Sequence, residues 1–120
     1  MVILITAKGG ININNRIYQL RAKVAKALAH QTRLEIVDIL TDEGEKCVCE
    51  LTEILDVSQS SVSKHLGILK NAGIVDSRKE GLNVWYNLRT PCVSSFFNCL
   101  DDILSKDIQR RKEDLIAGDK

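Results

Sequence analysis

The chain has 120 residues, and its 17 Lys and Arg against 16 Asp and Glu give a formal net charge of +1. Apolar residues make up 44% and charged residues 28%, which is an ordinary balance for one globular domain and excludes a polycation. No apolar run reaches the roughly 20 residues of a membrane span, and the apolar start at 1–7 is too short for a signal peptide. With a single Pro and few aromatic residues, we expect a mainly helical, cytoplasmic protein without a membrane partner.

Residues 1–15 contain two adjacent Gly and a run of Asn, and we expect them to form a flexible arm. Residues 16–29 predict a first helix, because apolar residues recur there at the helical spacing and cations occupy the other side. His30 receives no role in this interpretation. Residues 33–42 predict a second helix with Arg33 in its first turn, where the helix dipole disfavours a cation, and a phosphate partner is one explanation.

An acidic block follows at 41–56, with six Asp or Glu against one Lys, and suits either a cation site or plain solvent exposure. Residues 47–56 predict a short third helix with Cys47 and Cys49 at its start. The reducing cytosol disfavours structural disulfides, so these thiols are expected to serve packing, metal binding or redox chemistry.

The segment 57–73 predicts the helix around which the rest of the chain is organised. Ser58 is a plausible N-cap, and Val62, Leu66 and Leu69 form one apolar stripe. Small hydroxyls and cations occupy the opposite side, which suits approach to a DNA major groove. An ordinary amphipathic surface helix is the alternative, and the turn from the preceding helix favours a helix-turn-helix.

Residues 74–79 and 84–88 predict two strands joined by a turn, and such a hairpin after a recognition-type helix is a wing. Five Lys or Arg against two acids make 58–89 locally basic, as contact with phosphate requires. Trp85 and Tyr86 are mid-strand, and packing is the favoured interpretation for both.

Pro91 ends the wing, and a last helix is expected to follow. Its apolar side, which includes Phe96 and Phe97, is too wide for one stripe and suggests a dimer interface. Residues 106–120 become polar, and we expect them to form a fraying tail.

By this point the chain resembles the ArsR/SmtB family of winged-helix repressors over about residues 16–105. Four stretches carry the resemblance: ALAHQTRLEIVDIL (27–40), KCVCELTEIL (46–55), VSQSSVSKHLGILKNAGIV (57–75) and KEGLNVWYNL (79–88). The resemblance implies a homodimeric winged helix-turn-helix protein, mainly α with a small β-hairpin. It also implies a two-fold double-stranded DNA operator that is released when an effector binds.

Combined with this resemblance, the sequence predicts two sets of contact residues. The predicted DNA-binding residues are Arg33, Ser58, Gln59, Ser60, Ser61, Ser63, Lys64, His65, Lys70, Arg78, Lys79 and Asn83. The predicted dimer interface comprises Ile17, Leu20, Phe96, Phe97, Leu100, Ile103 and Leu104.

The thiols resemble the CVC-containing motif of the arsenic-responsive members. As(III) and Sb(III) favour three thiolates, and soft divalent metals such as Cd(II) also accept sulfur, so Cys47 and Cys49 are the predicted ligands. The three-thiol pattern has a further Cys where this chain has Thr52, so Cys92 or Cys99 is a possible third ligand. An exogenous thiol is another source, and an inert Cys47/Cys49 pair is the alternative. Packing is the favoured role for Cys92 and Cys99.

These observations predict a DNA-binding repressor that needs no cofactor to bind DNA and releases it on thiolate binding of As(III) or a soft metal ion. One alternative is a thiol-based redox sensor of the same fold, and another is a winged-helix module for protein contacts. No catalytic constellation is visible in the sequence, so we do not expect an enzyme.

Overall fold

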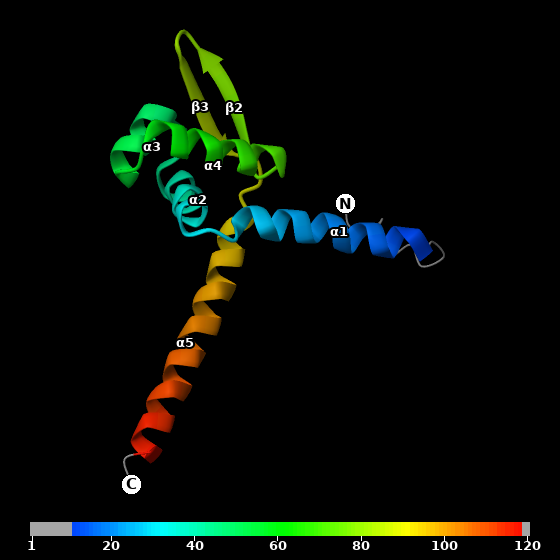
Figure 1. Ribbon diagram of the computed structural model, residues 1–120, viewed down its shortest axis with the longest axis vertical. Coiled ribbons are helices and arrows are strands. Elements are labelled where there is room, and N and C mark those ends of the chain that lie inside the picture. Colours follow the sequence, from blue (N-terminus) through cyan, green and yellow to red (C-terminus); the bar gives the residue numbers. More distant parts are fainter. Residues whose placement is uncertain (1–10, 119–120) are drawn as a thin grey trace. The chain divides into compact units, whose positions relative to one another are not determined.

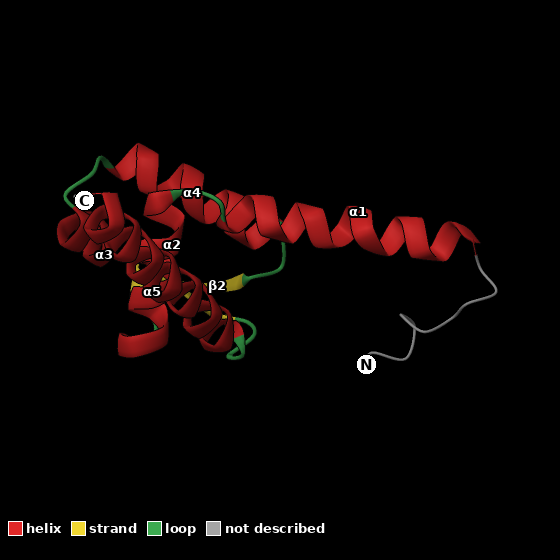
Figure 2. Ribbon diagram, turned by 90° about the horizontal axis from the view of Figure 1, so that it is seen from below, coloured by secondary structure: helices red, strands yellow, loops and turns green. Residues whose placement is uncertain are grey.

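The computed structural model describes residues 11–118, with side chains described from 15 to 116. The chain divides after Arg89 into two compact units, and each is described by itself. The elements of the first unit are α1 (Ile11–Leu28), α2 (Gln31–Glu43), β1 (Lys46–Cys47), α3 (Val48–Leu55), α4 (Gln59–Asn71), β2 (Val75–Glu80) and β3 (Asn83–Leu88). The second unit contains α5 (Val93–Gly118). Helices dominate (Figures 1 and 2), as the sequence predicts.

The core of the first unit forms where α2, α3 and α4 pack together beside the sheet. The predicted stripe of α4 is confirmed, because Val62, Leu66 and Leu69 are all completely buried. Ile36 of α2 and Leu51 of α3 are buried as fully. Since burying such a side chain is worth about 1.5–3 kcal/mol, these contacts fix the angle at which α4 presents its opposite side.

The sheet has three antiparallel strands in the order β1-β3-β2. The two long strands form the predicted hairpin, in which Glu80 pairs with Asn83 across a two-residue turn. Gly81 has a φ of 63° at the first turn position, where a side chain would be strained. The strand β1 was not predicted, because two residues are too few to show an alternating pattern. It pairs with β3 through Lys46–Tyr86 and Cys47–Trp85.

The first helix differs from the prediction at its start. It begins at Ile11, inside the expected arm 1–15, while residues 1–10 lie outside the described part of the chain. The stretch from Ile11 to Arg16 carries three Asn and one Arg beside two Ile, so the apolar pattern that located the helix does not reach its beginning. Among the α1 side chains that the structure describes, from residue 15 on, the buried ones are Ala27 and Leu28 at the end of the helix.

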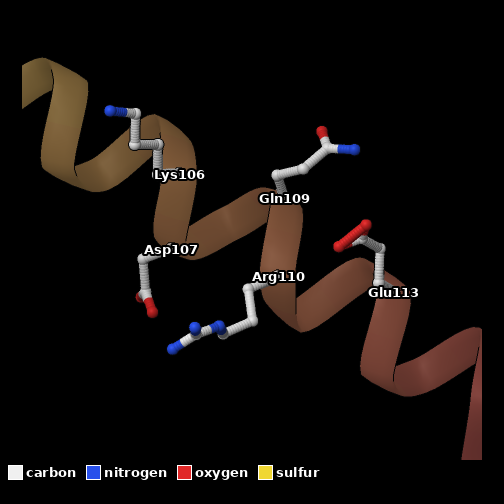
Figure 3. Close-up of a pocket in the computed structure, with 5 residues that line it drawn as sticks. All are labelled: Lys106, Asp107, Gln109, Arg110 and Glu113. Atoms are coloured by element: carbon white, nitrogen blue, oxygen red, sulfur yellow. The ribbon is translucent and has the colours of Figure 1, made fainter.

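The last helix also differs from the prediction, because α5 continues through the expected tail to Gly118. Ion pairs one turn apart, Lys106 with Asp102 and Arg111 with Asp107, support this polar stretch. Figure 3 shows charged and amide side chains projecting outward from successive turns of α5. No helix of the described residues is both long and apolar enough to pass through a bilayer.

Candidate nucleic-acid interface and thiol site

The recognition helix, as we call α4, begins as predicted. The Ser58 hydroxyl accepts a hydrogen bond from the backbone N–H of Ser61 over 3.2 Å, and Ser60 Oγ lies 3.3 Å from Ser58 Oγ. Exposed side chains opposite the buried stripe belong to Gln59, Ser60, Ser63 and Lys64. Ser61 and His65 are half-buried at the flank. The helix therefore offers a small, polar and cationic front held rigidly from behind.

Lys70 lies at the end of the same helix, where its ammonium donates a hydrogen bond to Ser77 Oγ over 2.7 Å. Ser77 belongs to β2, so this bond connects the recognition helix to the wing. In this arrangement one of the predicted DNA-binding cations is already hydrogen-bonded within the protein.

At the wing tip, the predicted residues Lys79 and Asn83 are exposed, and Leu82 between them is fully exposed. The side chains of Lys79 and Asn83 can reach a surface that approaches the tip. The wing therefore presents one cation and one amide beside an apolar side chain.

Arg78 is placed differently from its neighbour Lys79. Its guanidinium donates to both carboxylate oxygens of Glu45, with distances of 2.9 and 2.8 Å, and lies 3.5 Å from Glu80. The bond from Arg78 lowers the pKa of the Glu45 carboxyl, and the same bond raises the pKa of Arg78. The guanidinium carbon is also 5.8 Å from the ring centre of Trp85. Glu45, in the acidic block, is thus a wing partner that sequence reasoning missed.

Arg33 is also engaged within the protein. Its Nε donates to the Ala27 carbonyl over 2.6 Å and its second terminal nitrogen to the Lys26 carbonyl over 3.4 Å, at the end of α1. The remaining terminal nitrogen lies 3.1 Å from Nδ1 of His65 on the recognition helix. This placement accounts for a cation in the first turn of α2 without a phosphate.

His30, which received no role, is the N-cap of α2. Its Nδ1 accepts a hydrogen bond from the backbone N–H of Thr32 over 3.0 Å. Its ring centre is 4.4 Å from that of His65. Ser, Thr, Asp and Asn are the usual N-cap residues, so the sequence pattern did not indicate His30.

Cys47 lies at the junction of β1 and α3. As the N-cap of α3, its sulfur accepts a hydrogen bond from the Glu50 N–H over 3.4 Å, and Glu50 Oε1 accepts one from the Cys47 N–H over 3.1 Å. Cys47 is 3% exposed, whereas Cys49 is exposed. The helix-start position predicted for the pair is therefore observed, with one sulfur buried and one accessible.

Contrary to the expectation from the sequence, Cys47 and Cys49 form a disulfide. Their Cα atoms are 5.4 Å apart, within the usual range, because the chain passes from a strand into a helix between them. Cys92 and Cys99 are free and exposed, so packing within the chain does not explain them. Within the described residues no group of three or more His, Cys, Asp or Glu could hold a metal ion.

The predicted dimer residues divide between the two units. On α1, Leu20 is 44% exposed and Ile17 is half-buried. On α5, Phe96, Ile103 and Leu104 are 40%, 64% and 57% exposed, while Phe97 and Leu100 are partly buried. Both helices thus carry apolar side chains that the single chain leaves accessible.

Comparison with known proteins points to one family. The sequence model of the bacterial regulatory protein arsR family matches residues 30–77, which run from the N-cap of α2 into the wing. The chain belongs to the arsR family. Its members are regulatory proteins, and the prediction that the chain is not an enzyme is confirmed.

Two curated relatives cover the winged-helix part. A cadmium resistance transcriptional regulatory protein CadC homolog of Staphylococcus aureus is 49% identical over 67 residues, which are 56% of this chain and 55% of that protein. The arsenical resistance operon repressor of Escherichia coli is 44% identical over 71 residues, or 59% of this chain and 61% of that protein. The chain thus spans between half and two thirds of the length of these relatives.

A solved structure agrees in fold. The homodimeric winged helix-turn-helix DNA-binding domain Mb0332 of Mycobacterium bovis has a TM-score of 0.73 and 26% identity. The match covers 86% of this chain and 94% of that chain. The predicted fold class, a mainly helical winged helix-turn-helix, is confirmed.

Proposed function

We propose that the protein is a homodimeric transcriptional repressor that binds a two-fold operator and releases it when a thiophilic effector binds. The observation that carries this proposal is the recognition helix, in which the completely buried Val62, Leu66 and Leu69 hold an open polar front. The homodimeric M. bovis domain and the arsenical resistance repressor support it.

In this proposal the front of α4 enters the major groove of double-stranded DNA. Gln59 and Ser63 face base edges, and Lys64 holds a phosphate. Lys79 and Asn83 of the wing contact the flanking backbone. The apolar side chains of α1 and α5 pair with those of a second copy, which places two recognition helices about one helical turn, roughly 34–36 Å, apart.

Cys47 and Cys49 are the proposed effector ligands. Their short Cα separation lets both sulfurs reach one ion when they are reduced, and the exposed Cys49 gives that ion access. Two thiolates suit As(III), Sb(III) or Cd(II), and the third ligand of a pyramidal As(III) site would be Cys92, Cys99 or an exogenous thiol. The names of the arsenic and cadmium resistance relatives support this class of effector.

Two physical routes lead from these thiols to the DNA-facing elements. Cys47 caps α3, and α3 packs against α4. Cys47 also pairs with Trp85 in β3, the inner strand of the wing hairpin. A ligand that pulls Cys47 towards Cys49 would therefore strain both the helix cap and the edge of the sheet.

The test is operator release by the reduced protein. Fluorescence anisotropy with the duplex that precedes its own gene would be followed as As(III), Cd(II) and Zn(II) are added separately under anaerobic conditions. We expect As(III) or Cd(II) to release the DNA from wild-type protein but not from Cys47→Ser or Cys49→Ser. Cys92→Ser and Cys99→Ser show whether either sulfur completes the site, since loss of As(III) release in one of them would identify the third ligand. Tight binding that is indifferent to every ion would contradict the effector proposal.

A redox switch is the second candidate function, favoured by the disulfide between Cys47 and Cys49. Hydrogen peroxide would oxidise the two thiols, which lose two electrons and two protons to form the disulfide while the peroxide becomes two waters. Release by peroxide alone, reversed by a dithiol, would favour this candidate over ion sensing. DNA affinity that lacks sequence preference and salt dependence would instead favour a protein-interaction module.

A further inference from the structure

The side chain of Arg33 joins three helices at one point. It donates to two carbonyls at the end of α1, belongs to the first turn of α2, and reaches His65 on the recognition helix. The residues at this junction are far apart in the chain, since 32 positions separate Arg33 from His65. The recognition helix therefore has a polar attachment to α1 in addition to its buried apolar stripe.

The direction of the bond between Arg33 and His65 follows from their chemistry. A guanidinium can only donate, so the Nδ1 atom of His65 must be the acceptor and the ring must be neutral, with its proton on Nε2. Burial, His30, Arg33 and Lys64 all lower the pKa of His65, in agreement with a neutral ring. The hydrogen bonds from Arg33 to the two α1 carbonyls and to the neutral His65 ring therefore occupy its guanidinium within the protein.

We propose that Arg33 is a positioning residue for DNA binding, which fixes the recognition helix against the end of α1 through His65 and holds no DNA phosphate. This inference rests on the proposed function, and it replaces the prediction from the sequence that Arg33 contacts DNA. Because α1 carries predicted dimer residues, the attachment would set the position of each recognition helix relative to the two-fold axis. Arg33 would then govern fit to the operator rather than attraction to DNA in general.

Salt dependence separates the two roles. A phosphate contact releases a counterion, so losing it lowers the slope of log affinity against log salt by about 1 and weakens binding to every sequence. A positioning residue does neither. Its loss weakens operator binding while the salt slope and the affinity for unrelated DNA stay unchanged.

The experiment uses the full-length protein and fluorescence anisotropy at several salt concentrations, with the operator duplex and a scrambled duplex of the same length. We expect Arg33→Lys and Arg33→Gln each to weaken operator binding about tenfold or more, because both lose the planar fork that reaches all three partners. Lys64→Gln is the matched control, since it removes a cation at a predicted phosphate contact. It should weaken binding to both duplexes and lower the slope by about 1.

Substitution of His65 tests the route. Asn can present its amide oxygen near the place of Nδ1, so His65→Asn should retain more operator affinity than His65→Leu, which offers no acceptor. Equal losses in the two variants would show that His65 itself is needed at the DNA, and would overturn the positioning route. Near wild-type binding by Arg33→Lys, together with a lower salt slope in Arg33→Gln, would identify Arg33 as a phosphate ligand.

A measurement without DNA separates this inference from the proposed function. In the free protein, NMR titration of the His65 ring should show a higher pKa in Arg33→Gln than in wild type, because a neighbouring cation is removed. The same spectra show whether each variant is folded. An unchanged His65 titration would overturn the positioning role even if the wild-type protein binds its operator. Failure of the wild-type protein to bind any duplex would instead refute the proposed function.

Discussion

Two places in the winged-helix unit, which we call the Arg33 corner and the Arg78 corner, each contain an arginine whose hydrogen-bond partners belong to the protein itself. The chemistry of these partners differs between the two corners. Arg33 is half-buried and donates to two carbonyls and an imidazole, which are neutral acceptors. Arg78 lies in the open, with 49% of its side chain exposed, and pairs with the carboxylates of Glu45 and Glu80. One corner thus depends on hydrogen bonds from a partly desolvated cation to neutral acceptors, and the other on charge-assisted hydrogen bonds to carboxylates at the surface.

The difference separates cations that are engaged within the protein from cations that are available to DNA. Arg33, Lys70 and Arg78 all have acceptors on other elements of the chain. Lys64 and Lys79 are exposed on the front of the recognition helix and at the wing tip. The cations predicted from the sequence to bind DNA therefore include some that are bonded within the protein and others whose side chains are exposed.

The largest expected effect comes from the buried side of the recognition helix. Leu66 is completely buried beneath the recognition helix, so Leu66→Ala should lower the free energy of unfolding by about 2–5 kcal/mol. Urea denaturation followed by circular dichroism measures the change. Ser63→Ala, on the exposed front of the same helix, is the matched control, and its stability should stay within about 0.5 kcal/mol of wild type. Similar losses of unfolding free energy in the two variants would contradict the division of α4 into a buried apolar side and an exposed polar side.

The part of the fold that could be predicted from the sequence is the part that depends on local spacing, as in α4. Burial of Val62, Leu66 and Leu69 follows from local spacing along one helix, and the Ser58 cap is a local signal as well. The strand β1 could not be predicted, because its two residues gain their structure from pairing with β3 about 40 positions later. Local patterns predicted the elements, while pairing between distant residues decided the details.

The candidate site was less predictable for the same reason. Cys47 and Cys49 are neighbours in the chain, so their place at a helix start could be predicted from the sequence. His65, the partner of Arg33 on the recognition helix, and Glu45, the bidentate partner of Arg78, lie 32 and 33 positions away, and nothing in the local sequence indicates them. Charge and position alone predicted DNA contacts for both arginines, and those contacts stay a prediction, while the protein partners could not be predicted.

The next largest effect is a loss of stability whose dependence on salt differs between the Arg33 corner and the Arg78 corner. Arg33→Gln should lower the free energy of unfolding by about 1–2 kcal/mol, since hydrogen bonds of a partly buried charged group are lost. Arg78→Gln should cost less at low salt and almost nothing in 1 M NaCl, where the Debye length is about 3 Å and the exposed pair is screened. Urea denaturation at 0.05 and 1 M NaCl gives the comparison. A loss in Arg33→Gln that also vanishes in 1 M NaCl would make the two corners alike.

The smallest expected effect is a difference in pH dependence between the corners. Burial and the nearby cations Arg33 and Lys64, with His30, lower the pKa of His65 below its usual 6.5. Just below pH 6.5 the unfolded chain therefore binds a proton that the folded chain does not bind. The free energy of unfolding has its full value above pH 6.5 and declines as the pH falls below it. The carboxyl of Glu45 has a pKa below its usual 4.5, so its contribution persists to lower pH and declines only below 4.5.

His65→Asn and Glu45→Gln separate these two windows. Urea denaturation between pH 8 and pH 3.5 should show that His65→Asn flattens the decline just below pH 6.5, while Glu45→Gln leaves that decline unchanged and flattens the one below pH 4.5. The decline in stability just below pH 6.5 reports whether Arg33 donates to a neutral His65 ring on the recognition helix. A decline below pH 6.5 that persists in His65→Asn would show that another group titrates there, and that protonation of His65 does not oppose the Arg33 attachment.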